Sequence, residues 1–199
     1  MNKMQILLFS LIVLSFGFPN NDLKSGDIEY DEHKNKLEGM VKEYYENGKL
    51  KSEINYHDGK KNGLCKKYYL SGGLEEVDKY KAGVKEGISN IFYENGKLRA
   101  EHNFKKGKPF GKNITFHDNG NLESEANFDL EGYIKGLSKE YYRDGKLKAE
   151  IIFEEGSVYP SSHKAYYNNG KLKERSYIEN GSRIFLKYNE QGNLIKYMD

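Results

Sequence analysis

The sequence is short of cysteine, tryptophan, proline and apolar residues. Of its 199 residues, one is cysteine, three are proline and none is tryptophan. The single cysteine, Cys65, cannot form an internal disulfide, so the fold depends on hydrogen bonds and packing. Hydrophobic residues make up 37% of the chain and the mean hydropathy is -0.87. That is too little apolar material for a thick two-layer core.

An excess of charge of one sign is also missing. The 32 Lys and Arg residues and the 30 Asp and Glu residues leave a formal net charge of +2, with both signs interleaved along the chain. Proteins that bind nucleic acid usually gather basic residues on one face and carry a higher overall charge. The balance therefore argues against a nucleic-acid partner.

Tyrosine, phenylalanine and glycine are abundant. Aromatic residues make up 14% of the chain, and 21 residues are glycine. Disordered chains are poor in aromatics, so this chain is expected to fold. Its rings are spaced regularly along the sequence, which suits a thin sheet or a solenoid better than a globule.

Residues 1–18 differ from everything that follows them. The run from Ile6 to Phe18 is almost entirely apolar and has the length of the hydrophobic part of a secretory signal. The small residues Ser15 and Gly17 fit cleavage after Gly17. We therefore predict a helical signal peptide over 1–18 and export to the periplasm, the cell envelope or the medium. An uncleaved membrane anchor is the alternative.

From residue 39 onward the sequence repeats a unit of about 24 residues. We take residues 19–38 as a linker and N-terminal cap, and residues 39–199 as the repeat array. With Gly39 as position one, position six is aromatic, position ten is glycine and position twelve is leucine in all seven copies. The copies begin at Gly39, Gly63, Gly87, Gly111, Gly136, Ser161 and near Arg183.

Each unit has the pattern of a β-hairpin. A dipeptide such as Asn47-Gly48 between short Tyr-, Ile- and Leu-containing runs is a strong hairpin signal, because glycine readily adopts positive φ. Positions two, six, twelve and eighteen share parity, so we expect them on one core-facing side. For positions six and twelve to meet, the loop must hold an odd number of residues. This favours a three-residue connection with a bulge at the glycine. A second glycine, such as Gly59, marks the turn into the next hairpin.

A single hairpin cannot bury its apolar face, so the copies are expected to stack side by side. The predicted fold is all-β: an elongated, single-layer antiparallel sheet of stacked β-hairpin repeats that follows the N-terminal signal helix. The terminal strands of such a sheet leave exposed edges, through which copies of the chain can associate.

The sequence shows no catalytic or metal-binding constellation. Its five histidines are scattered, none is paired at ligand spacing, and no second cysteine completes a zinc site. We therefore predict no enzymatic activity, no metal and no cofactor. An enzyme acting on an envelope polymer would need a clustered pair of acids. Instead, we expect the repeated glutamates of position fifteen to pair with lysines on the solvent face. They are Glu53, Glu101, Glu125 and Glu150.

The tyrosines at position seven are the candidate binding residues. They are opposite in parity to the predicted core, so we expect a row of partly exposed rings bordered by lysines. Such a row suits a protein, peptide or glycan surface. The alternative is a packing ladder in which the rings lie under lysine stems and stiffen the sheet. The predicted partner-binding residues are Tyr45, Tyr69, Tyr93, Tyr142 and Tyr167, with His117 in the middle copy.

The recurring unit Gly-x-x-x-x-Tyr-Tyr-x-Asn-Gly-Lys-Leu-x-x-Glu-x-x-Tyr-x-x-Gly resembles the MORN repeat, in the bacterial variant often described as a YwqK-family antitoxin. The resemblance covers residues 39–199. It implies a sheet of stacked hairpins whose role is to hold or bind something. MORN-type arrays are associated with membrane-proximal scaffolding, with lipid or protein binding and with self-association.

These observations together predict an exported, non-enzymatic binding or scaffolding module. Its expected partner is a protein or a cell-envelope polymer, with peripheral membrane contact and without nucleic acid. The alternative is an antitoxin or immunity protein that neutralises a toxin. Export argues against that alternative for a toxin that acts in the cytosol, whereas retention in the cytosol would favour it.

Overall fold

The structure is a computed structural model that describes residues 29, 31–155, 157 and 159–198. The predicted signal peptide, residues 1–18, lies outside the described residues. Within the part that is described, no helix is long and apolar enough to cross a membrane. The described chain is all-β and forms one open antiparallel sheet, as predicted.

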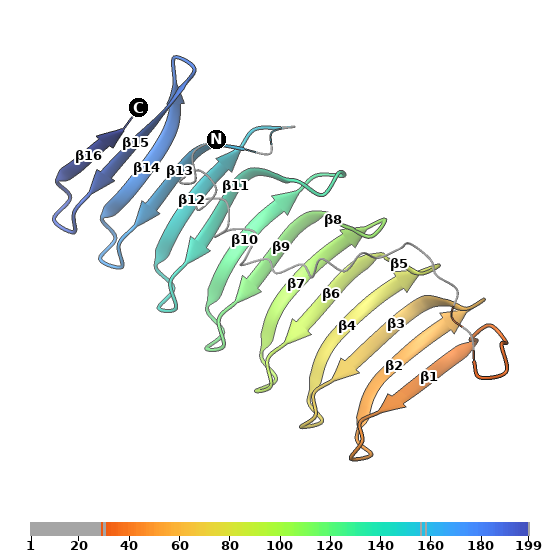
Figure 1. The fold of residues 1–199 in the computed structure, drawn as a ribbon. Coiled ribbons are helices and arrows are strands. Elements are labelled where there is room, and N and C mark those ends of the chain that lie inside the picture. Colours follow the sequence, from red (N-terminus) through yellow and green to blue (C-terminus); the bar gives the residue numbers. More distant parts are fainter. Residues whose placement is uncertain (1–28, 30, 156, 158, 199) are drawn as a thin grey trace.

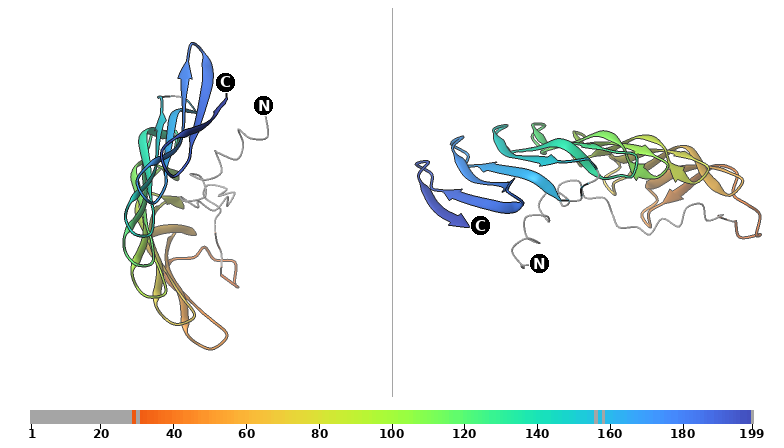
Figure 2. Two further views of the ribbon diagram at one scale, coloured as in Figure 1. Left: turned by 90° about the vertical axis from the view of Figure 1, so that its left-hand side faces the viewer. Right: turned by 90° about the horizontal axis from the view of Figure 1, so that it is seen from above.

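The strands follow one another across the sheet in chain order (Figure 1). Seven hairpins lie side by side in a single layer, and the strip that they form is bowed along its length (Figure 2). The short strands β5 and β8 only extend the pairing of β4 and β7. The strands are β1 (Gly39–Tyr44), β2 (Leu50–His57), β3 (Lys60–Tyr68), β4 (Leu74–Lys81), β5 (Val84–Lys85), β6 (Gly87–Phe92), β7 (Leu98–Lys105), β8 (Lys108–Pro109), β9 (Gly111–Phe116), β10 (Leu122–Phe128), β11 (Ile134–Tyr141), β12 (Leu147–Phe153), β13 (Pro160–Tyr166), β14 (Leu172–Glu179), β15 (Ser182–Tyr188) and β16 (Leu194–Met198).

The turn inside each unit is the predicted three-residue connection. In the first unit the Tyr45 amide donates to the Lys49 carbonyl at 2.8 Å, and the Gly48 amide donates to the Tyr45 carbonyl at 2.9 Å. Gly48 has a φ of 80°, which places the bulge at the glycine. The same two bonds recur in the other six units, so the prediction is confirmed.

The turns between units are of a different kind. After β2 the loop has only two residues, Asp58 and Gly59, and both have positive φ, at 51° and 72°. This is the type I′ geometry whose twist matches that of the strands. The turn after β10 is longer, because the fourth copy has one residue more than the first three: here the Asp129 amide donates to the Tyr133 carbonyl.

A second bulge in every hairpin changes the assignment of faces. In the first unit Glu43 pairs with Ser52 but Tyr44 pairs with Leu50, so Lys51 is an extra residue. Positions six and twelve meet across the hairpin, as predicted. The expectation that positions two and eighteen share their face with them is half wrong, because the extra residue at position thirteen moves position eighteen to the opposite face.

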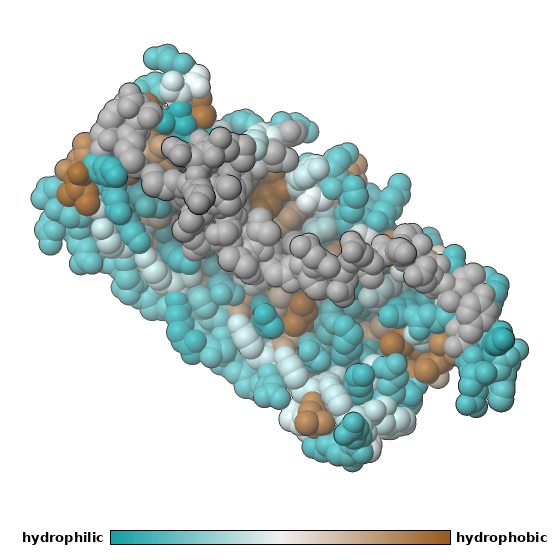
Figure 3. Space-filling view, in the orientation of Figure 1, coloured by the Kyte–Doolittle hydropathy of each residue, from teal (hydrophilic) through white to brown (hydrophobic). Residues whose placement is uncertain are grey.

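We call the two sides the inner and outer faces. The inner face carries positions three, five, fourteen, sixteen and eighteen, and apart from Ile184 it holds every side chain that is buried in the described part of the chain. Many of these side chains are small, alanine and serine above all. Apolar groups gather in separate patches (Figure 3), and one cluster contains Ala126, Phe128 and Ile151.

The outer face carries positions two, four, six, twelve, fifteen and seventeen. Here Glu53 accepts a hydrogen bond from the Tyr68 hydroxyl at 2.8 Å and pairs with Lys42 at 3.1 Å. Glu125 is bound in the same way, by Tyr141 at 3.1 Å and Lys112 at 2.9 Å. The predicted pairing of position-fifteen glutamates with lysines is thus confirmed for these two units.

Glu29 and Leu37 contact the turn between the first two units. The Glu29 amide donates to the Gly59 carbonyl at 2.7 Å, and the Gly59 amide donates to the Leu37 carbonyl at 2.9 Å. The described part of the predicted linker and N-terminal cap is therefore hydrogen-bonded to this turn, and residues 19–28 and 30 of that segment lie outside the described residues.

Replacing Ala82 tests the cost of positive φ in these turns. Ala82 has a φ of 49° in a two-residue turn. The equivalent turns have Asp58 and Asn180 at this position. We expect Ala82→Asn to raise the free energy of unfolding by about 0.5–1 kcal/mol, because Asn tolerates this conformation better. Ala82→Val should lower it. Urea unfolding of the two variants would contradict this interpretation if both shifted the midpoint in the same direction.

Candidate functional site

The predicted tyrosines do form one row. Tyr45, Tyr69, Tyr93, Tyr142 and Tyr167 each follow directly after the first strand of a hairpin, and each is half-buried. Alternation along the strand places position seven on the same side as positions three and five. The row therefore belongs to the inner face, at the hairpin tips, whereas the sequence pattern had placed it opposite to the residues of position eighteen.

Each tyrosine hydroxyl in the row is engaged by the next unit. It donates a hydrogen bond to the backbone carbonyl of that unit's position-six residue, which otherwise has no strand partner on that side. A hydrogen bond of this kind ties neighbouring repeats side chain to backbone. The bonds run from Tyr45 to Tyr68 (2.6 Å), from Tyr69 to Phe92 (2.6 Å), from Tyr93 to Phe116 (2.7 Å), from Tyr142 to Tyr166 (2.7 Å) and from Tyr167 to Tyr188 (2.9 Å).

Polar side chains at the tips add parallel bonds between units. The Lys97 ammonium donates to the Asn119 carbonyl at 2.8 Å, and Lys171 binds the Gln191 carbonyl at 2.9 Å. The Asn95 amide group donates to the Asp118 carbonyl at 3.2 Å. Together with the tyrosines these contacts form what we call the tip ladder, which holds each hairpin tip against the next.

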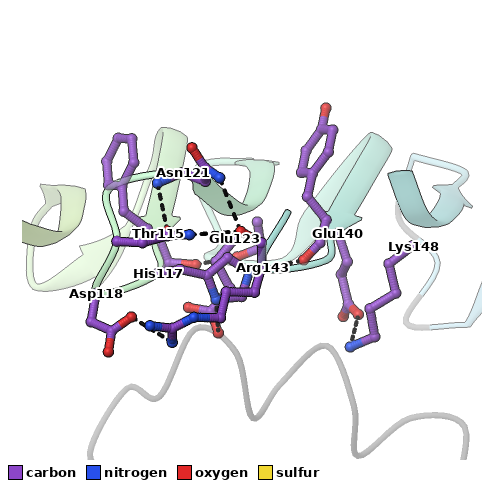
Figure 4. A network of polar contacts seen from close by, with 12 residues as sticks. Thr115, His117, Asp118, Asn121, Glu123, Glu140, Arg143 and Lys148 are labelled. Atoms are coloured by element: carbon purple, nitrogen blue, oxygen red, sulfur yellow. Dashed lines mark hydrogen bonds and ion pairs between the residues drawn. The ribbon is translucent and has the colours of Figure 1, made fainter. Parts of the chain in front are cut away.

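The middle copy keeps the ladder with a different residue. His117 Nε2 lies 3.0 Å from the Tyr141 carbonyl, so this nitrogen carries the proton and donates. His117 Nδ1 lies 3.8 Å from Glu123, while Asp118 and Arg143 form an ion pair at 2.5 Å across the same two tips (Figure 4). The His117 imidazole therefore donates to the next unit as a tyrosine hydroxyl does in the other copies.

The rings themselves are partly covered. The Arg99 guanidinium lies 5.8 Å from the centre of the Tyr93 ring, and the Lys173 ammonium lies 5.8 Å from that of Tyr167. Burial raises the pKa of Tyr69 and of Tyr93, so these phenols are neutral at ordinary pH. The contacts fit the packing ladder that was the alternative interpretation. Binding of a partner by the ring faces stays a prediction.

A row of exposed apolar side chains lies on the outer face. Met40, Leu64, Ile88 and Leu137 occupy position two and are 56%, 52%, 50% and 43% exposed. The row is interrupted in the fourth unit, where Lys112 occupies this position. We expected position two in the core, and that expectation is wrong: it shares a face with positions six and twelve, but the bulge at position thirteen leaves the buried positions fourteen, sixteen and eighteen on the other face. The signal in the sequence is that position thirteen is charged in the first six copies: Lys51, Glu75, Arg99, Glu123, Lys148 and Lys173.

The inner face of the second and third units carries an ionic cluster. The Lys85 ammonium lies 2.8 Å from Asp78 and 3.1 Å from Glu76, and Glu76 also pairs with Lys67 at 2.7 Å. The buried Asp78 carboxylate accepts a hydrogen bond from the Ser89 hydroxyl at 2.6 Å. Burial would raise the pKa of Glu76, but the charges and hydrogen bonds of Lys85 and Lys67 outweigh it and lower that pKa to about 2.

Two further titratable groups of the inner face are held neutral. Burial, with the positive charge of Lys85, lowers the pKa of His102 to about 4. Burial raises the pKa of the Cys65 thiol, as in a small, packed strand residue and unlike a reactive thiol. Among the described residues no three His, Cys, Asp or Glu side chains are placed to hold a metal ion together.

Comparison with known proteins identifies the repeats. A family model described as MORN repeat variant matches residues 37–58, 85–106, 111–129, 135–155 and 162–182, which together cover just over half of the chain. Residues 59–84 lie outside the matched segments, although their hairpin, β3–β4, has the same register and bulge.

The other two comparisons add little. No curated protein matches the chain. Among solved structures, the chain is similar to a crystal structure of a point mutant of S. aureus TarM in complex with fondaparinux, α-GlcNAc-glycerol and UDP. The identity is 11% and the TM-score 0.19, with 89% of this chain and 23% of that chain covered. At this TM-score the similarity carries no argument.

Removing one hydroxyl tests the tip ladder. We expect Tyr142→Phe to lower the free energy of unfolding by about 0.5–1.5 kcal/mol, because the Tyr166 carbonyl loses its donor. Tyr133→Phe is the matched control, since Tyr133 is 53% exposed and lies outside the ladder. An equal shift of the urea midpoint in both variants would show that the ladder hydroxyl contributes nothing of its own.

The ionic cluster makes stability depend on pH. Because the folded-state pKa of Glu76 is lowered from 4.5 to about 2, its contribution is present above pH 4.5 and is lost as the pH falls toward 2. We expect Glu76→Gln to cost roughly 1–3 kcal/mol at neutral pH and to weaken the acid-induced loss. Glu46→Gln, at an exposed hairpin tip, is the control. Unfolding curves from pH 7 to pH 2 that stay parallel for Glu76→Gln and wild type would contradict the assignment.

Proposed function

Because the chain belongs to the MORN repeat variant family, we propose that it is an exported, non-enzymatic module that holds a protein partner on its outer face. The observation that carries the proposal is the exposed apolar row formed by Met40, Leu64, Ile88 and Leu137. Soluble proteins seldom leave large apolar side chains exposed in a regular array unless something covers them.

The outer row has the geometry of a binding surface. Neighbouring members that are two strands apart lie roughly 10 Å from each other. The strands of Met40 and Leu64 also carry a lysine at position four, the exposed Lys42 and the half-buried Lys66. Apolar anchors beside polar side chains are the composition of protein–protein interfaces, where a few buried side chains supply most of the affinity.

The tip ladder supports the same proposal through the rigidity that it gives to the sheet. Because each tip is hydrogen-bonded to the next, the apolar row is carried on a stiffened frame. A preorganised surface loses less conformational entropy when a partner binds. The ladder residues Tyr45, Tyr69 and Tyr93 therefore contribute to binding through the rigidity of the frame, even where their rings do not contact the partner.

Export is the second part of the proposal. It rests on the apolar run from Ile6 to Phe18, which precedes the array in the sequence. Fractionation of cells expressing the full-length chain, with the intact mass of the product, tests it. We expect a mature form cut near Gly17 outside the cytosol. An uncut cytosolic chain would overturn export and favour the antitoxin interpretation.

Capture by the outer face can be tested with charge substitutions. Full-length protein is cross-linked in the envelope fraction, and captured proteins are quantified by mass spectrometry. We expect Leu64→Lys with Ile88→Lys to reduce capture of the partner at least tenfold, because two apolar anchors become charged. The matched control is Leu70→Lys with Leu130→Lys, since these leucines are 55% and 59% exposed but lie in turns. Equal capture by both double variants would rule out the outer row as the binding surface.

A further inference from the structure

The edge formed by the turns between repeats is divided by charge. The first three of these turns are rich in lysine and the last three in carboxylates, although the whole chain is nearly neutral. Because the strands follow one another in chain order, these turns lie side by side along one edge of the sheet (Figure 1). The basic half holds Lys60, Lys61, Lys81, Lys105, Lys106 and Lys108, and the acidic half holds Asp129, Glu131, Glu154, Glu155 and Glu179.

Three lysines at or beside these turns lack a carboxylate partner in the part of the chain that the structure describes. Several other lysines on the strands are paired, as Lys112 is with Glu125 at 2.9 Å. Lys79, Lys81 and Lys105 are exposed and form no ion pair with any of the described residues. Such an accumulation of unneutralised ammonium groups raises the local positive potential and attracts anions.

The carboxylates of this half are engaged in fixing its turns. Glu86 accepts a hydrogen bond from the Lys106 backbone amide at 2.7 Å. Asp58 pairs with Lys36 at 2.7 Å. The first contact joins the third turn to the residues that follow the second turn, and the second contact joins the first turn to the N-terminal segment.

A pocket of about 620 Å³ opens between these turns. Lys79, Lys81 and Glu86 line it from one unit, and Lys105 and Phe110 from the next. The Glu86 carboxylate is the one that accepts a hydrogen bond from the Lys106 amide. Lys105 lies 4.9 Å from the centre of the Phe110 ring, which holds its ammonium group at the rim. Gly87 forms part of the wall with a φ of 94°, and a Cβ there would lie 3.5 Å from the stem of Lys79. The missing side chain leaves the backbone open to a ligand.

We propose that this basic edge binds a linear polymer that carries phosphate groups and is not a nucleic acid. The cations are lysines without an arginine, and an ammonium group is a point charge that suits phosphate in many orientations, whereas arginine favours bidentate carboxylate contacts. Equivalent lysines such as Lys81 and Lys105 recur across two strands, roughly 10 Å apart. That spacing fits a chain running across the turns better than a single small anion.

The acidic half limits how far such a polymer extends. Beyond β10 the turns carry Asp129, Glu131, Glu154 and Glu155, which repel phosphate. The bound chain therefore covers the first three turns only. This proposal deepens the proposed function, because it names the chemistry of one ligand of the exported module. It uses the turn edge, however, and not the apolar row of the outer face.

Binding of inorganic polyphosphate to the full-length protein, measured by calorimetry, tests the proposal. We expect Lys81→Gln with Lys105→Gln to weaken binding at least tenfold and to reduce the slope of log K against log salt by roughly one to two. The control is Lys164→Gln with Lys187→Gln, which removes the same charge from exposed lysines outside the pocket. Equal weakening by both double variants would mean non-specific attraction and would overturn the site.

Competing ligands identify the chemistry. Polyglutamate, single-stranded RNA and vesicles with anionic phospholipid are titrated at equal concentrations of anionic groups. Tighter binding of polyphosphate than of all three supports the proposal, and preference for any one of them overturns it. The Lys81→Gln and Lys105→Gln variant is also assayed for capture of the protein partner. If polyphosphate fails to bind while capture persists, only this inference falls; loss of capture by the outer-row variants is the separate test of the proposed function.

Discussion

A single-layer sheet has no second layer to pack against, and the rest of this structure follows from that constraint. Each hairpin can be stabilised only by its two neighbours, so contacts between adjacent repeats take the place of a core. Strand pairing supplies the first set of contacts. The tip ladder supplies the second, because Tyr45 and its equivalents each donate to a carbonyl of the next unit. The inner face adds small packed side chains and buried ion pairs such as that of Asp78 with Lys85.

Much of this architecture is readable from the sequence, for reasons that are local. The glycine at position ten, such as Gly48, requires positive φ, and the odd loop length follows from the need for Tyr44 to meet Leu50. The repeat, the hairpins, both turns and the stacking order were therefore predictable. The assignment of faces was not, because it depends on one extra residue within a strand. A bulge is only one extra residue in the sequence, yet it reverses the side on which every later residue of the strand lies.

The candidate surfaces, too, could be predicted from the sequence only in part. The row of position-seven tyrosines was visible as a spacing, but the acceptor of each hydroxyl lies in the next unit and appears only when the units are docked. The apolar row of Met40 and Leu64 was placed in the core by parity. The basic edge was hidden by the near-zero net charge of the whole chain, since Lys105 and Glu154 cancel in a sum although they lie in different turns. Overall composition describes a compact globule better than an extended array, in which distant charges are screened from one another.

The direction of the tip ladder has a consequence for how such a protein changes in length. Every ladder tyrosine reaches toward the unit that follows it, and the last copy has Asn189 at this position, which caps its own turn instead. A unit duplicated between existing copies would bring its own donor and its own acceptor. Both new junctions could then form the ladder hydrogen bond without any further substitution. The array is in this sense modular: gene duplication inside it can lengthen the molecule in steps of one hairpin while the chemistry of each joint is inherited unchanged.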